Sequence, residues 1–239
     1  MTKVICLPFA GGSKYSFKVF EDYHCEDIDV VTLDYPGRGG RMREPLLSET
    51  VAIAHNLLSQ AKALIGNEDY VVYGHSMGAT VGFELVHFLM NAGLPQPTHL
   101  FVSGATGPAA FSRTVRNWAN LPKDELLKIL KDLNGMPEEI LNNDEFFDFY
   151  EPIIRADFKA VESYAYKKRQ PLNIPITVMN GTREPFDEQE VKLWDDETVF
   201  PVEYMKMEGH HFFIFDHVST IINTIRERVS TKQSTNYYG

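Results

Sequence analysis

Cysteine is scarce in this sequence. Cys6 and Cys25 are the only two among 239 residues, and Cys6 lies within an apolar run that is typical of a buried strand. This count excludes a disulfide framework as the main source of stability and favours a reducing compartment. We therefore expect a cytoplasmic protein.

Long apolar runs are missing as well. No stretch approaches the roughly 18 apolar residues that a membrane-spanning helix requires. The apolar run at residues 4–7 is too short for a secretory signal, and no small-residue cleavage site follows it. A soluble protein without a membrane partner is expected.

Basic residues are outnumbered by acidic ones. The 33 Asp and Glu against 23 Lys and Arg give a formal net charge of −10, which disfavours nucleic acid as a partner. An acidic protein partner would need a local basic cluster. One is available at Arg38, Arg41 and Arg43 and another at residues 167–169, although ordinary solvated charge explains either cluster equally well.

What remains is an ordinary globular composition. Hydrophobic residues make up 44% and charged residues 23% of the chain, which argues against a disordered or fibrous protein. A length of 239 residues lies within the range of one domain. We expect a single compact unit.

Short apolar, β-branched runs recur along the chain and predict buried parallel strands. Helical patterns lie between them. This alternation predicts βαβ units and an α/β fold with a mostly parallel, doubly wound sheet. The predicted strands are residues 4–9, 29–33, 70–73, 99–103, 174–180 and 201–207, and the predicted helices are residues 48–65, 77–91 and 218–229.

Residues 106–170 interrupt that alternation. They contain amphipathic helical patterns at 122–133 and 144–164, a turn at Gly135-Met136-Pro137, and no convincing strand. Such an all-helical insertion can serve as a lid over the strand ends that carry chemistry. We predict one α/β core formed by residues 1–105 and 171–230, a helical lid at 106–170, and a disordered tail at 231–239.

Gly74-His75-Ser76-Met77-Gly78 is the strongest functional signal. A strand-like run enters it and a helical pattern leaves it, as a Gly-x-Ser-x-Gly nucleophile elbow requires. The glycines leave room for a sharp turn that exposes the serine hydroxyl above a helix N-terminus. The pentapeptide alone also occurs where serine merely caps a helix. In this context it predicts a serine hydrolase of the α/β-hydrolase fold, with Ser76 as nucleophile.

The order of catalytic residues along the chain narrows the choice of the catalytic histidine. A serine hydroxyl is a weak nucleophile until a histidine takes its proton, and on this fold the acid and then the histidine follow the serine. That order excludes the histidines up to His99, and His217 begins the last predicted helix. His210 and His211, in the loop after the strand at 201–207, remain as alternatives.

The acid is expected in the loop after the strand at 174–180. Glu184 and Asp187 both lie there, and a carboxylate at this place would orient the imidazole and stabilise its charged form. Distance along the loop favours Glu184, with Asp187 as the alternative.

An oxyanion hole needs two backbone donors. The N–H of Met77, directly after the nucleophile, is one. The second is expected from Pro8-Phe9-Ala10-Gly11-Gly12, the loop after the first strand, and we predict Ala10. A plain glycine turn would explain Gly11 and Gly12 equally well.

Six segments spread over nearly the whole chain match one known family. They are Leu7-Pro8-Phe9-Ala10-Gly11-Gly12, Asp34-Tyr35-Pro36-Gly37-Arg38-Gly39, Gly74-His75-Ser76-Met77-Gly78, Leu133-Asn134-Gly135-Met136-Pro137, Ile154-Arg155-Ala156-Asp157-Phe158 and Glu162-Ser163-Tyr164. In these segments the chain resembles the type II thioesterases that work beside nonribosomal peptide and polyketide synthases. Several of the segments lie outside the catalytic loops, which makes the likeness more specific than the serine motif.

The resemblance bears on both open alternatives. In such families the acid is usually an aspartate three residues after the loop glycine and before a proline. Glu184 stands at that position before Pro185, and its longer side chain can still reach a histidine ring. The family histidine precedes an apolar or aromatic pair, as His211 does, so the resemblance favours His211 over His210.

The resemblance implies a thioester hydrolase that removes acyl or aminoacyl groups from the 4′-phosphopantetheine arm of an acyl or peptidyl carrier protein. It would edit stalled or misprimed synthases, for example in antibiotic biosynthesis. No metal or other cofactor of its own is implied, and we expect a monomer. The alternative is a carboxylesterase or lipase acting on free small-molecule esters, since the catalytic groups do not distinguish leaving groups. A non-catalytic scaffold is disfavoured because neither serine nor histidine is lost.

Overall fold

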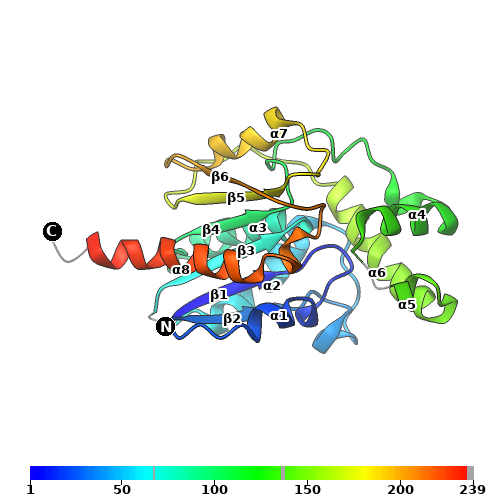
Figure 1. Ribbon diagram of the computed structural model, residues 1–239, viewed down its shortest axis with the longest axis horizontal. Coiled ribbons are helices and arrows are strands. Elements are labelled where there is room, and N and C mark those ends of the chain that lie inside the picture. The colour runs from blue at the N-terminus through cyan, green and yellow to red at the C-terminus, as the bar shows by residue number, and fades with distance from the viewer. Residues whose placement is uncertain (67, 136–137, 236–239) are drawn as a thin grey trace.

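A six-stranded parallel sheet runs through the molecule (Figure 1). The computed structural model describes residues 1–66, 68–135 and 138–235. The strand order is β2-β1-β3-β4-β5-β6. This arrangement confirms the predicted α/β-hydrolase class, with all six strands parallel. The strands are β1 (Thr2–Leu7), β2 (Ile28–Thr32), β3 (Tyr70–His75), β4 (Leu100–Ser103), β5 (Ile176–Gly181) and β6 (Glu203–Met207).

Helices cover both faces of this sheet (Figure 1). The pair α2 (Thr50–Leu64) and α3 (Met77–Asn91) packs on one face, whereas α1 (Lys18–Glu21) and α8 (Val218–Thr235) lie on the other. None of the described helices is both long and apolar enough to cross a bilayer. The remaining helices are α4 (Lys123–Leu133), α5 (Glu138–Leu141), α6 (Asp144–Glu162) and α7 (Glu188–Lys192).

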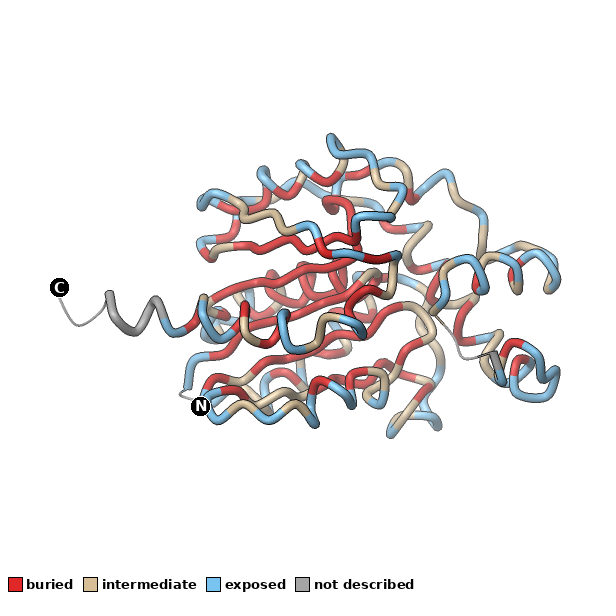
Figure 2. The backbone as a smooth tube through the Cα atoms, viewed as in Figure 1, coloured by how far each residue is buried: buried red, intermediate tan, exposed pale blue. Residues whose placement is uncertain are grey.

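The inner strands β1, β3, β4 and β5 are buried on both sides, as continuous apolar runs predict, whereas the edge strands β2 and β6 are mostly half-buried. In β1, Ile5 and Leu7 join the apolar cluster beneath α2 and α3, whereas Val4 and Cys6 join the cluster beneath α1 and α8. Figure 2 shows the central strands as the most buried part of the chain. Burial raises the pKa of the Cys6 thiol, so this cysteine stays protonated and inert.

Helices α4, α5 and α6 lie beyond the carboxyl ends of the strands (Figure 1), and we call them the helical lid. They share a small apolar cluster that includes Leu126, Leu130 and Phe158. The C-terminal half of α6 is also fixed to the core, because Thr50 Oγ1 donates to the carbonyl of Ala160 at 2.8 Å. The predicted boundaries at residues 106 and 170 fall in loops.

The structure differs from the predicted elements in the tail and in two short helices. The predicted tail at 231–239 is helical as far as Thr235, because no glycine or proline interrupts α8. Helices α1 and α7 have only four and five residues, too few for a helical period to be recognised in the sequence. Residues 236–239, and Met136 and Pro137 of the predicted turn, lie outside the described residues.

His87 on α3 makes the stability of this fold sensitive to acid. Its side chain is buried with its ring edge-on to Phe83. Burial, and secondarily the guanidinium of Arg169, lower the pKa of His87 to about 4 against the opposing effect of Glu84. In the unfolded chain the pKa is about 6.5. The contribution of neutral His87 is therefore complete above about pH 6.5 and is lost as the pH falls toward 4.

Replacing His87 with glutamine should flatten this pH dependence. We expect the difference in free energy of unfolding between pH 7 and pH 5, measured by urea unfolding, to be about 1–2 kcal/mol smaller in H87Q than in the wild type. Replacing the exposed His24 with glutamine is the control for losing a histidine. Equal pH dependence in H87Q and the wild type would contradict the prediction.

Candidate active site

Ser76 occupies a strained turn between β3 and α3. Its backbone φ of 56° and ψ of −117° lie where few non-glycine residues are found. The flanking glycines are required because a Cβ at Gly74 would lie 2.1 Å from the carbonyl oxygen of Gly78, and one at Gly78 would lie 2.1 Å from that of Leu7. The turn is held by a hydrogen bond from Ser76 N–H to the carbonyl of Ser103 at 2.8 Å. The serine hydroxyl is thereby presented at the end of the sheet.

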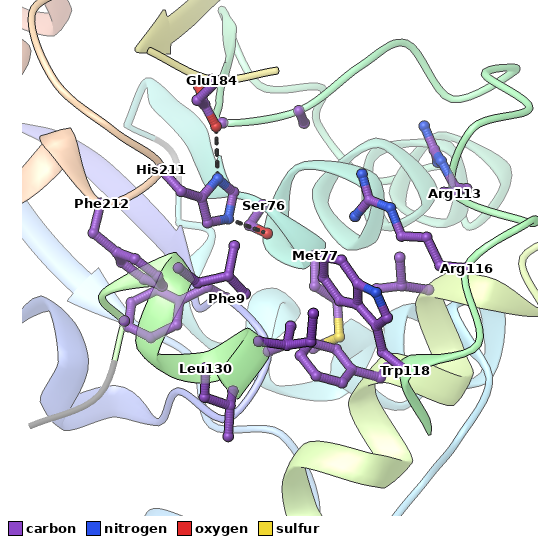
Figure 3. Close-up of a pocket in the computed structure, with 18 of the residues that line it drawn as sticks. Phe9, Ser76, Met77, Arg113, Arg116, Trp118, Leu130, Glu184, His211 and Phe212 are labelled. Carbon is purple, nitrogen blue, oxygen red and sulfur yellow. Dashed lines mark hydrogen bonds and ion pairs between the residues drawn. The ribbon is translucent and has the colours of Figure 1, made fainter. Parts of the chain in front are cut away.

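Ser76, His211 and Glu184 form one hydrogen-bonded chain (Figure 3). Ser76 Oγ lies 2.9 Å from His211 Nε2, and His211 Nδ1 lies 2.6 Å from Glu184 Oε1. The second carboxylate oxygen of Glu184 accepts the N–H of Gly181 at 2.7 Å. The Glu184 side chain is 2% exposed and that of His211 is 16% exposed. The Glu184 carboxylate is buried and makes two hydrogen bonds, and it holds the imidazole of His211 with Nε2 free to accept the serine proton.

The two alternatives from the sequence are not part of this chain. Asp187 is exposed and accepts the N–H of Gln189 at 2.7 Å, where it caps the N-terminus of α7. His210 is exposed, and its Nε2 lies 3.3 Å from Arg183 Nη1. The structure therefore brings together Glu184 and His211 with Ser76. Asp187 and His210 lie outside this hydrogen-bonded chain, although His210 lines the same pocket.

A second histidine lies behind His211. The rings of His75 and His211 are 5.0 Å apart, and His75 Nδ1 lies 2.9 Å from Ser103 Oγ. Burial, and secondarily the nearby His211, keep the pKa of His75 well below its usual range. His75 therefore stays neutral and adds no positive charge beside His211. Gly104 leaves room for both rings, since a Cβ there would lie 2.5 Å from the His75 ring and 3.2 Å from that of His211.

Both predicted oxyanion donors belong to residues that line the pocket around Ser76. Met77 is the first residue of α3, so its N–H has no helical partner four residues earlier. Ala10, in the loop after β1, lines the same pocket as Ser76 and Met77. Both residues therefore border the space around Ser76, and the oxyanion hole formed by their amides stays a prediction.

The pocket itself has a volume of about 330 Å³ and lies between the core and the helical lid. Met77, Trp118, Leu130 and Phe158 give it apolar walls. An apolar cavity of this size above a nucleophile is suited to the acyl part of a substrate.

Two arginines, Arg113 and Arg116, also line the pocket (Figure 3). Arg113 donates to Thr80 Oγ1 at 3.3 Å and to the carbonyls of Thr106 and Gly107 in the loop after β4, and burial lowers its pKa to about 10. Arg116 lies over the ring of Trp118 at 4.7 Å. The sequence did not reveal these residues because they lie in a connection without a motif.

Some residues of the two basic clusters that could bind an acidic partner are instead paired with carboxylates of the protein itself. Arg38 is 3% exposed and paired with Asp157, and Arg169 pairs with Glu84. Exposed members that remain are Arg43, Lys167 and Lys168. Within the described residues, no group of three or more His, Cys, Asp or Glu side chains could hold a metal ion.

Comparison with known proteins gives a consistent result. A family profile described as a thioesterase domain matches residues 2–229. The gramicidin S biosynthesis protein GrsT of Aneurinibacillus migulanus is 31% identical over 90% of this chain and 83% of its own length. The thioesterase PikA5 of Streptomyces venezuelae is 30% identical over 95% of this chain and 80% of its own.

A solved structure agrees in both fold and sequence. The type II thioesterase BorB from the borrelidin biosynthetic cluster superposes with a TM-score of 0.86 at 31% identity, over 95% of this chain and 92% of its own. The likeness therefore extends from the sheet through the helical lid.

Proposed function

This chain belongs to the thioesterase family, and we propose that it hydrolyses acyl and aminoacyl thioesters on the phosphopantetheine arm of an acyl or peptidyl carrier protein. Its relatives include proteins named for gramicidin S and borrelidin biosynthesis, which supports an editing role beside a nonribosomal peptide or polyketide synthase. The observation that carries the proposal is the hydrogen-bonded chain of Ser76, His211 and Glu184 beside the acyl-sized pocket.

In the first half of the proposed reaction Ser76 is acylated. His211 Nε2 takes the proton of Ser76 Oγ as the oxygen bonds to the thioester carbon, and the carbonyl oxygen becomes an anion. The N–H groups of Met77 and Ala10 stabilise that oxyanion. The carbon–sulfur bond then breaks, and the leaving thiolate of the phosphopantetheine arm receives the proton from His211. Glu184 stabilises His211 while it is charged.

In the second half, water releases the acid. His211 takes a proton from water as the hydroxide oxygen bonds to the ester carbon, and Met77 and Ala10 again hold the oxyanion. The bond to Ser76 Oγ breaks, and Oγ regains its proton from His211. These residues suffice for both steps, so we propose that no metal or other cofactor is needed. We also propose that the protein acts as a monomer in the cytoplasm, and the free buried Cys6 supports that location.

A comparison of leaving groups tests the function. One acyl group, such as hexanoyl, is offered as a carrier-protein thioester and as a free oxygen ester. Release of the acid is followed by intact-mass analysis, with S76A as the negative control. We expect kcat/KM for the carrier thioester to be at least about tenfold higher. Faster hydrolysis of the free oxygen ester would instead support a carboxylesterase and overturn the proposal.

A further inference from the structure

The loop that carries Ala10 is a tight turn whose shape depends on one peptide group. Gly12 N–H donates to the carbonyl of Phe9 at 2.9 Å, and Gly11 has a φ of 78°. This combination defines a type II β-turn, in which the central peptide between Ala10 and Gly11 is rotated relative to a type I turn. Because this peptide lies inside the turn that carries Ala10, a contact that anchors it fixes the position of the whole turn.

Asp157 of the helical lid binds this central peptide. Its Oδ2 accepts the N–H of Gly11 at 2.7 Å, and its side chain is fully buried. Ile154, one turn earlier on α6, packs so close to the turn that a Cβ at Gly11 would lie 3.2 Å from it. The amide of Gly11 is thereby occupied, which leaves the amide of Ala10 as the donor for an oxyanion.

Arg38 fixes Asp157 in turn. The Arg38 guanidinium makes a two-pronged contact with the Asp157 carboxylate, with Nη2 at 2.7 Å from Oδ1 and Nη1 bonded to Oδ2. Nη1 also lies 3.5 Å from the carbonyl of Gly12. A forked contact of this kind restricts the carboxylate in both direction and rotation. The carboxylate therefore meets Gly11 from one defined direction.

The segment around Arg38 holds the same loop at two more points. The hydroxyl of Tyr35 donates to the carbonyl of Pro8 at 2.7 Å, and Asp34 Oδ1 accepts the N–H of Lys14 at 2.7 Å. Both side chains are buried. The motif from Asp34 to Arg38 thus contacts the loop before, within and after the turn at Ala10, although none of its residues lines the pocket.

We propose that Asp157 and Arg38 are positioning residues for the oxyanion hole. By anchoring the turn at Gly11 and Gly12, they hold the loop in place and keep the Ala10 amide at the oxygen of the acyl group on Ser76. The inference rests on the proposed hydrolytic function, because an oxyanion hole matters only where an acyl group is attacked. It also explains why a lid helix and a loop after β2 carry motifs that catalysis itself does not use.

Two double variants separate this role from simple stabilisation. R38M/D157L and R38M/D157N both remove the ion pair, and replacement of a buried pair by neutral residues is often tolerated. They differ in one respect, since asparagine keeps an oxygen that can accept the Gly11 N–H. We expect kcat to fall by about 100-fold in R38M/D157L and by about tenfold or less in R38M/D157N, with KM little changed in both.

The rate at which a fluorophosphonate labels Ser76 should fall in parallel, since Oγ displaces fluoride while the phosphoryl oxygen occupies the oxyanion hole. Equal kcat in the two folded variants, or a rise in KM without a fall in kcat, would overturn the inference. If R38M/D157L does not fold, R38K is the test, because lysine keeps the charge and loses the forked contact with Asp157. About a threefold or larger fall in kcat is expected, and an unchanged kcat would overturn the inference. All variants are assayed on the substrate that the wild type hydrolyses, whether it is a thioester or an oxygen ester. A wild type that prefers oxygen esters would overturn the proposed function and would leave this test of the oxyanion hole valid.

Discussion

Replacing Glu184 with alanine is expected to lower kcat by about 10⁴-fold with little change in KM. Glu184 is the partner of His211 Nδ1 at 2.6 Å, so its loss frees the imidazole to adopt the other tautomer and removes the negative charge that stabilises the imidazolium. Neither effect acts on the bound substrate, which is why the loss falls on kcat. Steady-state hydrolysis of one acyl thioester measures the change.

Asp187 provides the matched control from the same loop. It caps α7 and is exposed, so D187A should keep kcat within about twofold of the wild type and lose at most about 1 kcal/mol of stability. E184D, which retains the carboxylate but withdraws it by one methylene, should lie between E184A and the wild type. An equal or larger loss in D187A than in E184A would show that the acid has been misassigned.

The fold could be predicted from the sequence because its signals are local. Each buried strand is a short apolar run, and each is followed by a helix or a loop, so the alternation is visible without tertiary contacts. The predicted strands at 70–73 and 99–103 correspond to β3 and β4 within a few residues. The site followed from the same logic, since the loops after parallel strands meet at one edge of the sheet. Ser76, Glu184 and His211 each lie just after such a strand.

The residues that the sequence did not assign act through contacts between distant segments. Arg38 and Asp157 are 119 positions apart, and each alone is an ordinary charged residue in a loop or on a helix. Each lies in a segment that resembles the thioesterase family, but no spacing rule relates the two segments. The basic residues around Arg38 instead indicate a surface for an acidic partner. Only packing of α6 against the loop after β1 brings Asp157 to Gly11 and Arg38 to Gly12. Arg113 and Arg116 were missed because their connection has neither period nor motif.

The second large effect is expected from adding one methyl group to the turn at Ser76. A Cβ at Gly78 would lie 2.1 Å from the carbonyl oxygen of Leu7 and 2.8 Å from that of Pro8. Both are backbone atoms, so no side-chain rotation relieves the overlap, and α3 must move away from β1. We expect G78A to lower the free energy of unfolding by at least about 3 kcal/mol.

Gly66 is the matched control, because a Cβ there would meet no atom within 4 Å. G66A should remain within about 0.5 kcal/mol of the wild type, and urea unfolding followed by circular dichroism measures both variants. Any folded fraction of G78A should also lose activity, since displacement of Leu7 and Pro8 shifts the loop that carries Ala10. Similar stability in G78A and G66A would mean that α3 can withdraw from β1 at little cost. The close approach of helix and strand would then not be what holds Ser76 in its strained conformation.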